Sequence, residues 1–186
     1  MARGCRLVCY CDDCQAYACF LAQRGEGILD GAGGTDIFQT CPGAVQLEAG
    51  HGELRCVRLT DKGLHRWYTA CCRTPVGNTL GAASFPFVGL VHAFLDVPEA
   101  RRDELLGAPL ARVQRRFAHG PVPGGAKEPL PLGYLARFAR LVARGYVRGL
   151  ARPSPFFVAG RPVRTPEVLP PGERAALGRA VAALAS

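Results

Sequence analysis

Three cysteines within six residues, in the spacing C-x-C-x-x-C, constrain this chain more than any other feature. They are Cys9, Cys11 and Cys14, and the intervening Asp12 and Asp13 favour a tight turn. Such a turn would direct three thiols at one ion, and soft thiolates select Zn²⁺ or an iron–sulfur cluster over hard cations. An iron–sulfur cluster usually takes a fourth cysteine close by in sequence, which favours zinc here. The segment therefore predicts a zinc site that is one ligand short of a tetrahedral set.

The missing ligand is either a distant cysteine, which closes the site, or water or substrate, which leaves it open. Cys71 and Cys72 are the distant candidates. Adjacent residues of a strand point to opposite sides, so only one of the two would face the ion unless the chain turns there, and Pro75 and Gly77 indicate such a turn. We expect one zinc ion held by the three clustered cysteines, with Cys71 or Cys72 completing or neighbouring the site.

All nine cysteines precede residue 73. Their odd number and the lack of an export signal before them argue against a disulfide framework, so we expect a cytoplasmic protein. The most apolar window, residues 80–97, is interrupted by Pro86 and His92, so no membrane span is expected. Four cysteines stand singly among apolar neighbours and are expected to be buried and inert: Cys5, Cys19, Cys41 and Cys56.

The charge divides the chain near residue 97. Up to Val97 there are eight basic and nine acidic residues, and beyond it there are fifteen basic and six acidic ones. Short apolar runs separated by turn residues predict antiparallel strands before this point, at residues 6–10, 37–40, 45–48, 54–59, 64–68 and 88–94, and a helical segment at 15–24. Helical periodicity predicts helices after it, at residues 101–106, 134–150 and 173–185. We expect an α+β protein with a cysteine-rich β module at residues 1–97 and a basic helical extension at 98–186, packed on or following it.

The cysteine motif is combined with an aromatic-rich segment, Arg66-Trp67-Tyr68, which leads to Cys71, and with a strand that ends at Asp96. In this combination, residues 9–96 resemble the family of glutathione-dependent formaldehyde-activating enzymes and centromere protein V, in a divergent bacterial branch. The resemblance implies an all-β, tent-like fold of the Mss4 type with cysteine-bound zinc. It also implies a carbon–sulfur lyase activity that joins glutathione to formaldehyde or reverses that step.

This chain departs from the family at the second, structural zinc ion that its members usually bind. No C-x-C pair precedes Cys9, and Tyr68 stands where the first cysteine of a C-x-x-C pair would be if Cys71 is the second. A chain truncated at its N-terminus would explain the first departure but not the second, so we expect one ion. Gln15 and Arg66 flank the two cysteine motifs and are candidates for contacting a substrate, the alternative being structural hydrogen bonding. No residue is assigned as the catalytic base.

An open zinc site would hold a thiol such as glutathione as an anionic nucleophile at neutral pH. The alternative function is a non-catalytic zinc module whose basic helices bind nucleic acid or an anionic surface. That alternative relies on a basic helix face made by Arg137, Arg140, Arg144 and Arg148. Aromatic side chains are not interleaved with these arginines, which disfavours nucleic acid. A redox-sensing role for Cys71 and Cys72 ranks last, because vicinal cysteines form strained disulfides.

Overall fold

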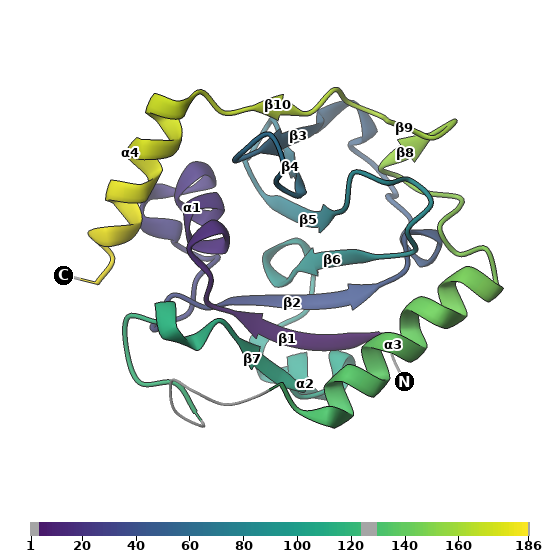
Figure 1. Ribbon diagram of the computed structural model, residues 1–186, viewed down its shortest axis with the longest axis horizontal. Coiled ribbons are helices and arrows are strands. Elements are labelled where there is room, and N and C mark those ends of the chain that lie inside the picture. The colour runs from purple at the N-terminus through teal and green to yellow at the C-terminus, as the bar shows by residue number, and fades with distance from the viewer. Residues whose placement is uncertain (1–3, 124–129, 186) are drawn as a thin grey trace.

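An eight-stranded sheet runs through the computed structural model, which describes residues 4–123 and 130–185 (Figure 1). Its strands are β1 (Cys5–Cys9), β2 (Thr35–Thr40), β3 (Leu54–Arg58), β4 (His65–Thr69), β5 (Pro75–Thr79), β6 (Val88–Val91), β7 (Ala111–Val113) and β10 (Glu167–Val168). Their spatial order is β10-β3-β4-β5-β6-β2-β1-β7. Neighbouring strands are antiparallel except at the two edges, where β7 runs parallel to β1 and β10 runs parallel to β3.

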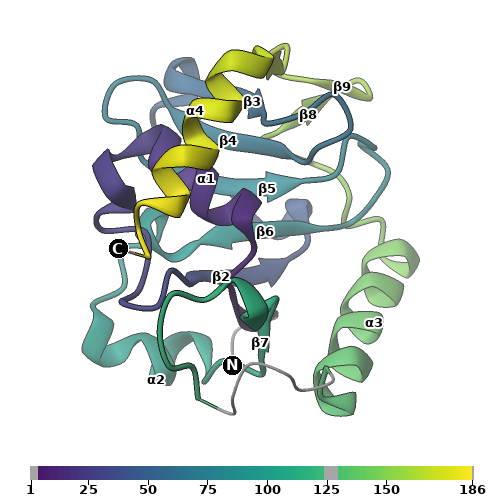
Figure 2. The ribbon, with the colours of Figure 1, turned by 60° about the vertical axis from the view of Figure 1, so that its left-hand side comes forward.

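Helices pack around this sheet. They are α1 (Asp12–Leu21), α2 (Arg102–Leu106), α3 (Leu132–Val147) and α4 (Pro171–Ala182), and a small hairpin is formed by β8 (Phe157–Val158) and β9 (Arg161–Pro162). Apolar side chains of α1 pack against Val57 of β3, Leu59 just after that strand, and Val91 of β6. Leu177 and Val181 of α4 pack against the same group. Figures 1 and 2 both show α4 beside α1. The predicted α+β class is confirmed. None of the described helices is long and apolar enough to cross a membrane.

The segment that was predicted to be a helical extension also completes the sheet. Residues 98–186 supply both edge strands, β7 and β10. Ion pairs of Arg6 in β1 add to this connection. Arg6 binds the buried Asp36 of β2 at 2.7 Å, and it also binds Asp103 of α2, which belongs to the second part of the chain. The hydroxyl of Tyr134 in α3 donates to Gln39 of β2 at 3.2 Å. The two predicted parts of the chain therefore share one sheet.

The prediction of a strand at residues 45–48 is wrong. A short 3₁₀ turn at Pro42–Ala44 follows β2, and the chain after it forms no strand before β3. The edge of β3 is paired with β10 at Val57 and Arg58. The alternation of apolar residues arises because Val45 and Leu47 pack against the core. A strand-like pattern therefore reflects side-chain burial without backbone pairing.

Candidate metal centre

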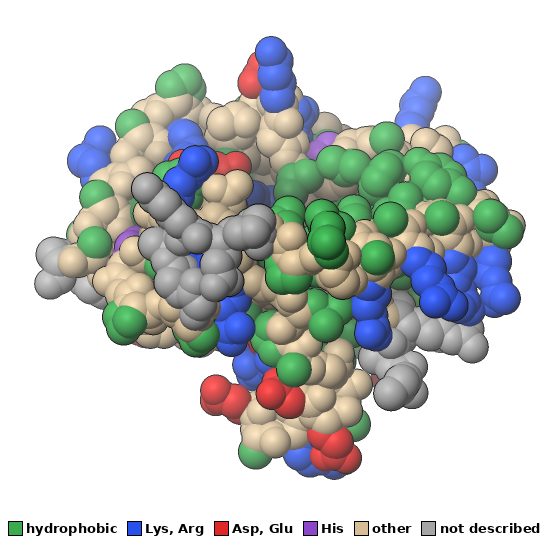
Figure 3. Space-filling view, turned by 60° about the horizontal axis from the view of Figure 1, so that its bottom comes forward, with side chains coloured by type: hydrophobic (Ala, Val, Ile, Leu, Met, Phe, Trp, Pro, Cys, Tyr) green, Lys and Arg blue, Asp and Glu red, His purple; other side chains and the backbone are tan. Residues whose placement is uncertain are grey.

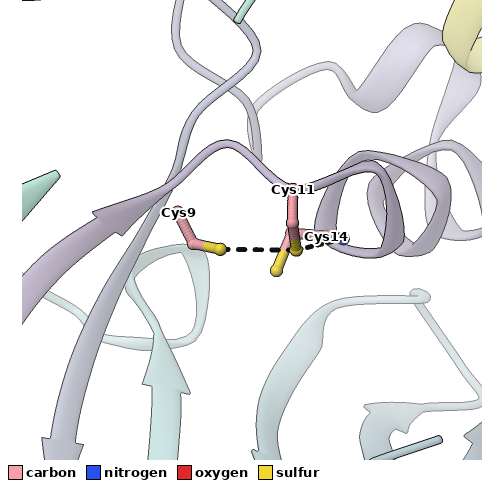
Figure 4. Close-up of side chains that lie close together, drawn as sticks. All are labelled: Cys9, Cys11 and Cys14. Carbon is pink, nitrogen blue, oxygen red and sulfur yellow. Dashed lines mark hydrogen bonds between the residues drawn. The ribbon is translucent and has the colours of Figure 1, made fainter. Parts of the chain in front are cut away.

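The turn between β1 and α1 brings the three clustered cysteines together (Figure 4). Cys9 is the last residue of β1, Cys11 caps the N-terminus of α1, and Cys14 lies within the first turn of the helix. The Sγ atoms of Cys9 and Cys11 lie 3.4 Å apart, and all three sulfur atoms lie within 4.8 Å of one another. The cluster could hold a metal ion, as the spacing of the motif predicts.

The local sequence explains why the chain turns at this point. The backbone of Cys11 is extended, and its Sγ accepts a hydrogen bond from the backbone N–H of Cys14 at 3.4 Å. The sulfur thus has the role that a side-chain oxygen usually has at a helix N-terminus. Asp12 and Asp13 form the first turn of α1, where the helix dipole stabilises negative charge. The same dipole favours ionised thiols at this end of the helix.

Arg66 of β4 places a positive charge beside the cluster. It is only 2% exposed, and its Nη1 lies 4.0 Å from the Sγ of Cys14. Nη1 also donates to Asn78 at 3.4 Å, and Nη2 lies 3.6 Å from the carboxylate of Asp13. The guanidinium lies over the ring of Tyr17, 5.3 Å from its centroid. These contacts hold a buried cation against one of the three thiols.

The three thiols differ in pKa. The pKa of Cys14 lies well below the usual thiol value, because it receives hydrogen bonds from Cys11 and Cys9 and because Arg66 faces it. The pKa values of Cys9 and Cys11 are raised, first by their hydrogen bonds within the cluster and also by burial. Within the cluster, Cys14 is therefore the thiol that loses its proton most readily in the absence of a metal. A metal ion would displace the protons of the other two thiols when it binds.

Cys71 and Cys72 lie in the turn between β4 and β5, where both are exposed. Their Sγ atoms are 3.7 Å apart. Cys71 follows Arg66, the residue of β4 that contacts Cys14, by five positions and lies beyond the end of that strand at Thr69. Within residues 4–123 and 130–185 the metal-ligand group contains only the three clustered cysteines. A ligand role for Cys71 or Cys72 stays a prediction.

Cys72 is expected to react with iodoacetamide as an ionised thiol at neutral pH. The hydroxyl groups of Thr69 and Thr74 lie 3.0 and 3.1 Å from its Sγ, and their hydrogen bonds lower the pKa of Cys72 to about 7. Because the thiolate is the nucleophile, the alkylation rate should rise with pH through about 7 and level off above it. Peptide mass spectrometry after timed labelling measures this profile. Thr74→Val should move the midpoint upward, and a midpoint near 9 in the unaltered chain would contradict the assignment.

Gln15 is buried at 1% exposure in α1. Its side-chain amide donates to the backbone carbonyl groups of Tyr10, at 2.9 Å, and Phe117, at 3.0 Å. These bonds connect the turn that carries the cysteines to the chain after β7, which is the structural alternative considered for this residue. A substrate contact by Gln15 or Arg66 stays a prediction.

Sequence reasoning missed Asn78 and Tyr17, and it treated Asp13 only as a turn residue. Asn78 is placed by strand register, because it lies opposite Arg66 in the β4–β5 pair. Tyr17 has no polar neighbour in sequence, but it lies one turn beyond Cys14 on α1, and this helical spacing could have indicated a common face. Asp13 also binds Arg174 of α4 at 2.9 Å. Asn78, Tyr17 and Asp13 each contact Arg66 and hold its side chain in place.

Four cysteines outside the two motifs were expected to be buried and inert. Burial raises the pKa of the Cys5 thiol to about 11 and that of the Cys56 thiol to about 12. Burial also raises the pKa of Cys41. These three cysteines are buried within the described chain, as predicted. Cys19 is only partly buried.

Comparison with known protein families identifies a family for this chain. No curated protein and no solved structure matches the chain. A family model matches residues 4–167, a range that includes the cysteine cluster, Arg66 and α3. The chain therefore belongs to the family of unknown function DUF6151.

Proposed function

We propose that Cys9, Cys11 and Cys14 bind one Zn²⁺ ion and leave its fourth position open to a small thiol such as glutathione. The closeness of the three sulfur atoms carries this proposal. Thiolates bound at about 2.3 Å to a tetrahedral zinc ion lie about 3.8 Å apart. That value lies between the 3.4 Å that separates the Sγ atoms of Cys9 and Cys11 and the 4.8 Å within which all three Sγ atoms lie. Three protein ligands with an open position are typical of zinc sites that act on a substrate.

The charge around the cluster supports the same proposal. Three thiolates and Zn²⁺ together carry one negative charge, and a buried charge is costly unless it is compensated. Arg66 supplies a positive charge 4.0 Å from the sulfur of Cys14. The N-terminus of α1 adds a partial positive charge at Cys11 and Cys14. Arg66 of β4 and the N-terminus of α1 would therefore compensate the negative charge of a zinc ion bound by the three thiolates.

The activity that we propose is carbon–sulfur lyase or adduct formation of the glutathione-dependent formaldehyde-activating type, on a fold of the Mss4 type. The sequence resemblance of residues 9–96 and the mostly antiparallel sheet support it. In the forward reaction the glutathione sulfur bonds to the carbonyl carbon of formaldehyde. The π electron pair moves to the oxygen, which takes up the proton lost by the thiol. Bound zinc would supply the Lewis acid that keeps the thiol ionised near neutral pH.

The chain's own residues prepare the site for this chemistry. Cys9 and Cys14 hold their sulfur atoms from a strand and a helix, both rigid elements, with Cys11 at the turn between them. Hydrogen bonds from Cys11 and Cys9 lower the pKa of Cys14, and the charge of Arg66 lowers it further. The same positive charge also favours an anionic thiol nearby. The hydrogen bonds of Gln15 fix the turn between the two elements.

The proposed activity predicts that purified protein consumes formaldehyde only when glutathione is present. Chelation should abolish this consumption and added zinc should restore it, as followed by a colorimetric formaldehyde assay. Cys14→Ala should lose the activity, whereas the exposed double variant Cys71→Ser with Cys72→Ser should keep both zinc and activity. A zinc-loaded protein without glutathione-dependent turnover would disprove the reaction and leave the metal site standing. Loss of zinc in the double variant would instead show that the site is closed by one of those cysteines.

A further inference from the structure

A groove of about 870 Å³ lies between α3 and the turn that follows β2, away from the cysteine cluster. Helix α3 contributes Arg137, Arg140 and Arg144 to its lining, and Arg148, the residue directly after the helix, is the fourth arginine. The sequence alone assigned these arginines to a basic outer face of the helix. The structure places them along a concave site whose volume is in the range of small-molecule pockets.

The groove is held open between two contacts of α3. At Gly145 a Cβ atom would come within 2.6 Å of Pro86 and 3.0 Å of the Cys41 sulfur, so the absence of a side chain lets the helix lie close to the sheet there. At the end of the helix, the N–H of Gly43 donates to the carbonyl oxygen of Leu150 at 2.8 Å. The contact of Gly145 with Cys41 and that of Gly43 with Leu150 each join segments about a hundred residues apart in sequence. The groove is therefore a fixed feature of the fold.

The positive charge of this groove has no counter-charge in the described chain. No aspartate or glutamate lines the groove, and none of the four guanidinium groups forms an ion pair with a described residue. Among the described residues, Arg137 Nε donates to the carbonyl oxygen of Gly4 at 3.1 Å. Like charges three and four positions apart on a helix repel one another. Figure 3 shows basic side chains gathered on the right-hand side of the molecule, the side on which Figure 1 places α3.

The remaining lining is mostly aliphatic. Cys41, Ala44, Leu141 and Leu150 provide apolar surface, and none of the residues that line the groove is aromatic. Nucleic-acid sites of single strands rely on aromatic side chains that stack on bases, so this lining fits a base poorly. A hydrocarbon chain fits it well, because apolar surface is buried against apolar surface. Guanidinium groups in turn match the geometry and charge of phosphate.

We propose that this groove binds a small alkyl phosphate, with its phosphate or diphosphate group at the arginine row and its aliphatic chain on the apolar floor. The site is separate from the cysteine cluster and does not depend on the proposed reaction. The arginine row supplies the charge that a dianionic head group requires. The concave shape favours a single molecule over the flat surface of a membrane.

The test is calorimetric titration of the full chain with octyl phosphate below its micelle concentration. Binding at one molecule per chain is expected, with inorganic phosphate and octanol each at least about tenfold weaker. Arg140→Gln and Arg144→Gln should each weaken binding by about tenfold, the loss expected when a charge-assisted hydrogen bond is removed. The matched control is Arg161→Gln, an exposed arginine of β9 outside the groove, which should bind as the unaltered chain does.

A second variant tests the apolar part of the site without altering the core. Ala136 is exposed on α3 and lines the groove, so Ala136→Trp should fill it and abolish octyl phosphate binding while zinc content and melting temperature stay unchanged. Absence of octyl phosphate binding, or binding that Ala136→Trp leaves intact, would overturn the proposal. Tighter binding of a single-stranded oligonucleotide than of octyl phosphate would also overturn it, in favour of a nucleic-acid role for the arginines.

Discussion

Replacing Cys14 with serine is expected to reduce the bound zinc from one equivalent per chain to almost none. Cys14 is buried, it is the thiol of the cluster whose pKa is lowered, and its sulfur lies within 4.8 Å of both other sulfur atoms of the cluster. If the site supplies about 10 kcal/mol, as structural zinc sites do, one of three thiolates accounts for on the order of 3 kcal/mol, or roughly a hundredfold in affinity. Serine is close to cysteine in size but provides no thiolate. Inductively coupled plasma mass spectrometry of the purified variant measures the loss.

The matched control for this variant is Cys56→Ser, because Cys56 is also buried but lies on β3 outside the cluster. It should retain one equivalent of zinc even if its free energy of unfolding falls. Full zinc occupancy in Cys14→Ser would contradict the assignment of the cluster. Loss of zinc in both variants would point to unfolding as the cause, which far-ultraviolet circular dichroism of the two proteins detects directly.

Replacing Arg66 with leucine is expected to destabilise the protein strongly and to weaken zinc binding. The substitution removes the cation that faces the Cys14 sulfur and the group that donates to Asn78 Oδ1, both in the interior. Removing one partner of a buried charged pair costs about 3–5 kcal/mol in the free energy of unfolding. Loss of a group that supports a metal ligand lowers metal affinity by about 10–100-fold. Urea denaturation and competitive zinc titration measure the two effects.

Arg66→Lys separates the charge of this residue from its geometry. Lysine keeps the positive charge but lacks the planar fork that reaches Cys14, Asn78 and Asp13 together, so an intermediate effect is expected on both measurements. Arg161→Leu, on the exposed strand β9, is the control for loss of an arginine and should change the unfolding free energy by no more than about 0.5 kcal/mol. Equal zinc affinity in Arg66→Leu and the unaltered chain would refute the role given to Arg66.

The features that could be predicted from the sequence are local ones. The cysteine cluster is predictable because one tight turn gathers all three thiols, and Cys11 itself caps the helix that follows. Helix α3 is predictable from its period, although it begins at Leu132 and ends at Val147 where residues 134–150 were expected. The strand expected at residues 88–94 stops at Val91, because a 3₁₀ turn at His92–Phe94 follows it. Periodicity thus identifies an element more reliably than it identifies the element's ends.

The features that could not be predicted depend on contacts between distant segments. Strands β7 and β10 have three and two residues, too few to show an alternating pattern, and they exist because the edges of β1 and β3 offer partners. Asn78 meets Arg66 only through the register of β4 and β5. The arginines of α3 follow a regular spacing in sequence, but the groove beside them depends on how closely Gly145 lets the helix approach Cys41.

The zinc content of the purified, unaltered protein tests the central claim most directly. Protein expressed in zinc-supplemented medium and passed through a desalting column should contain one equivalent of zinc per chain by inductively coupled plasma mass spectrometry. That zinc should be released when the three clustered thiols are titrated with a mercurial reagent. A folded protein that contains no zinc, and that takes up none when reduced and titrated with zinc at neutral pH, would contradict the account.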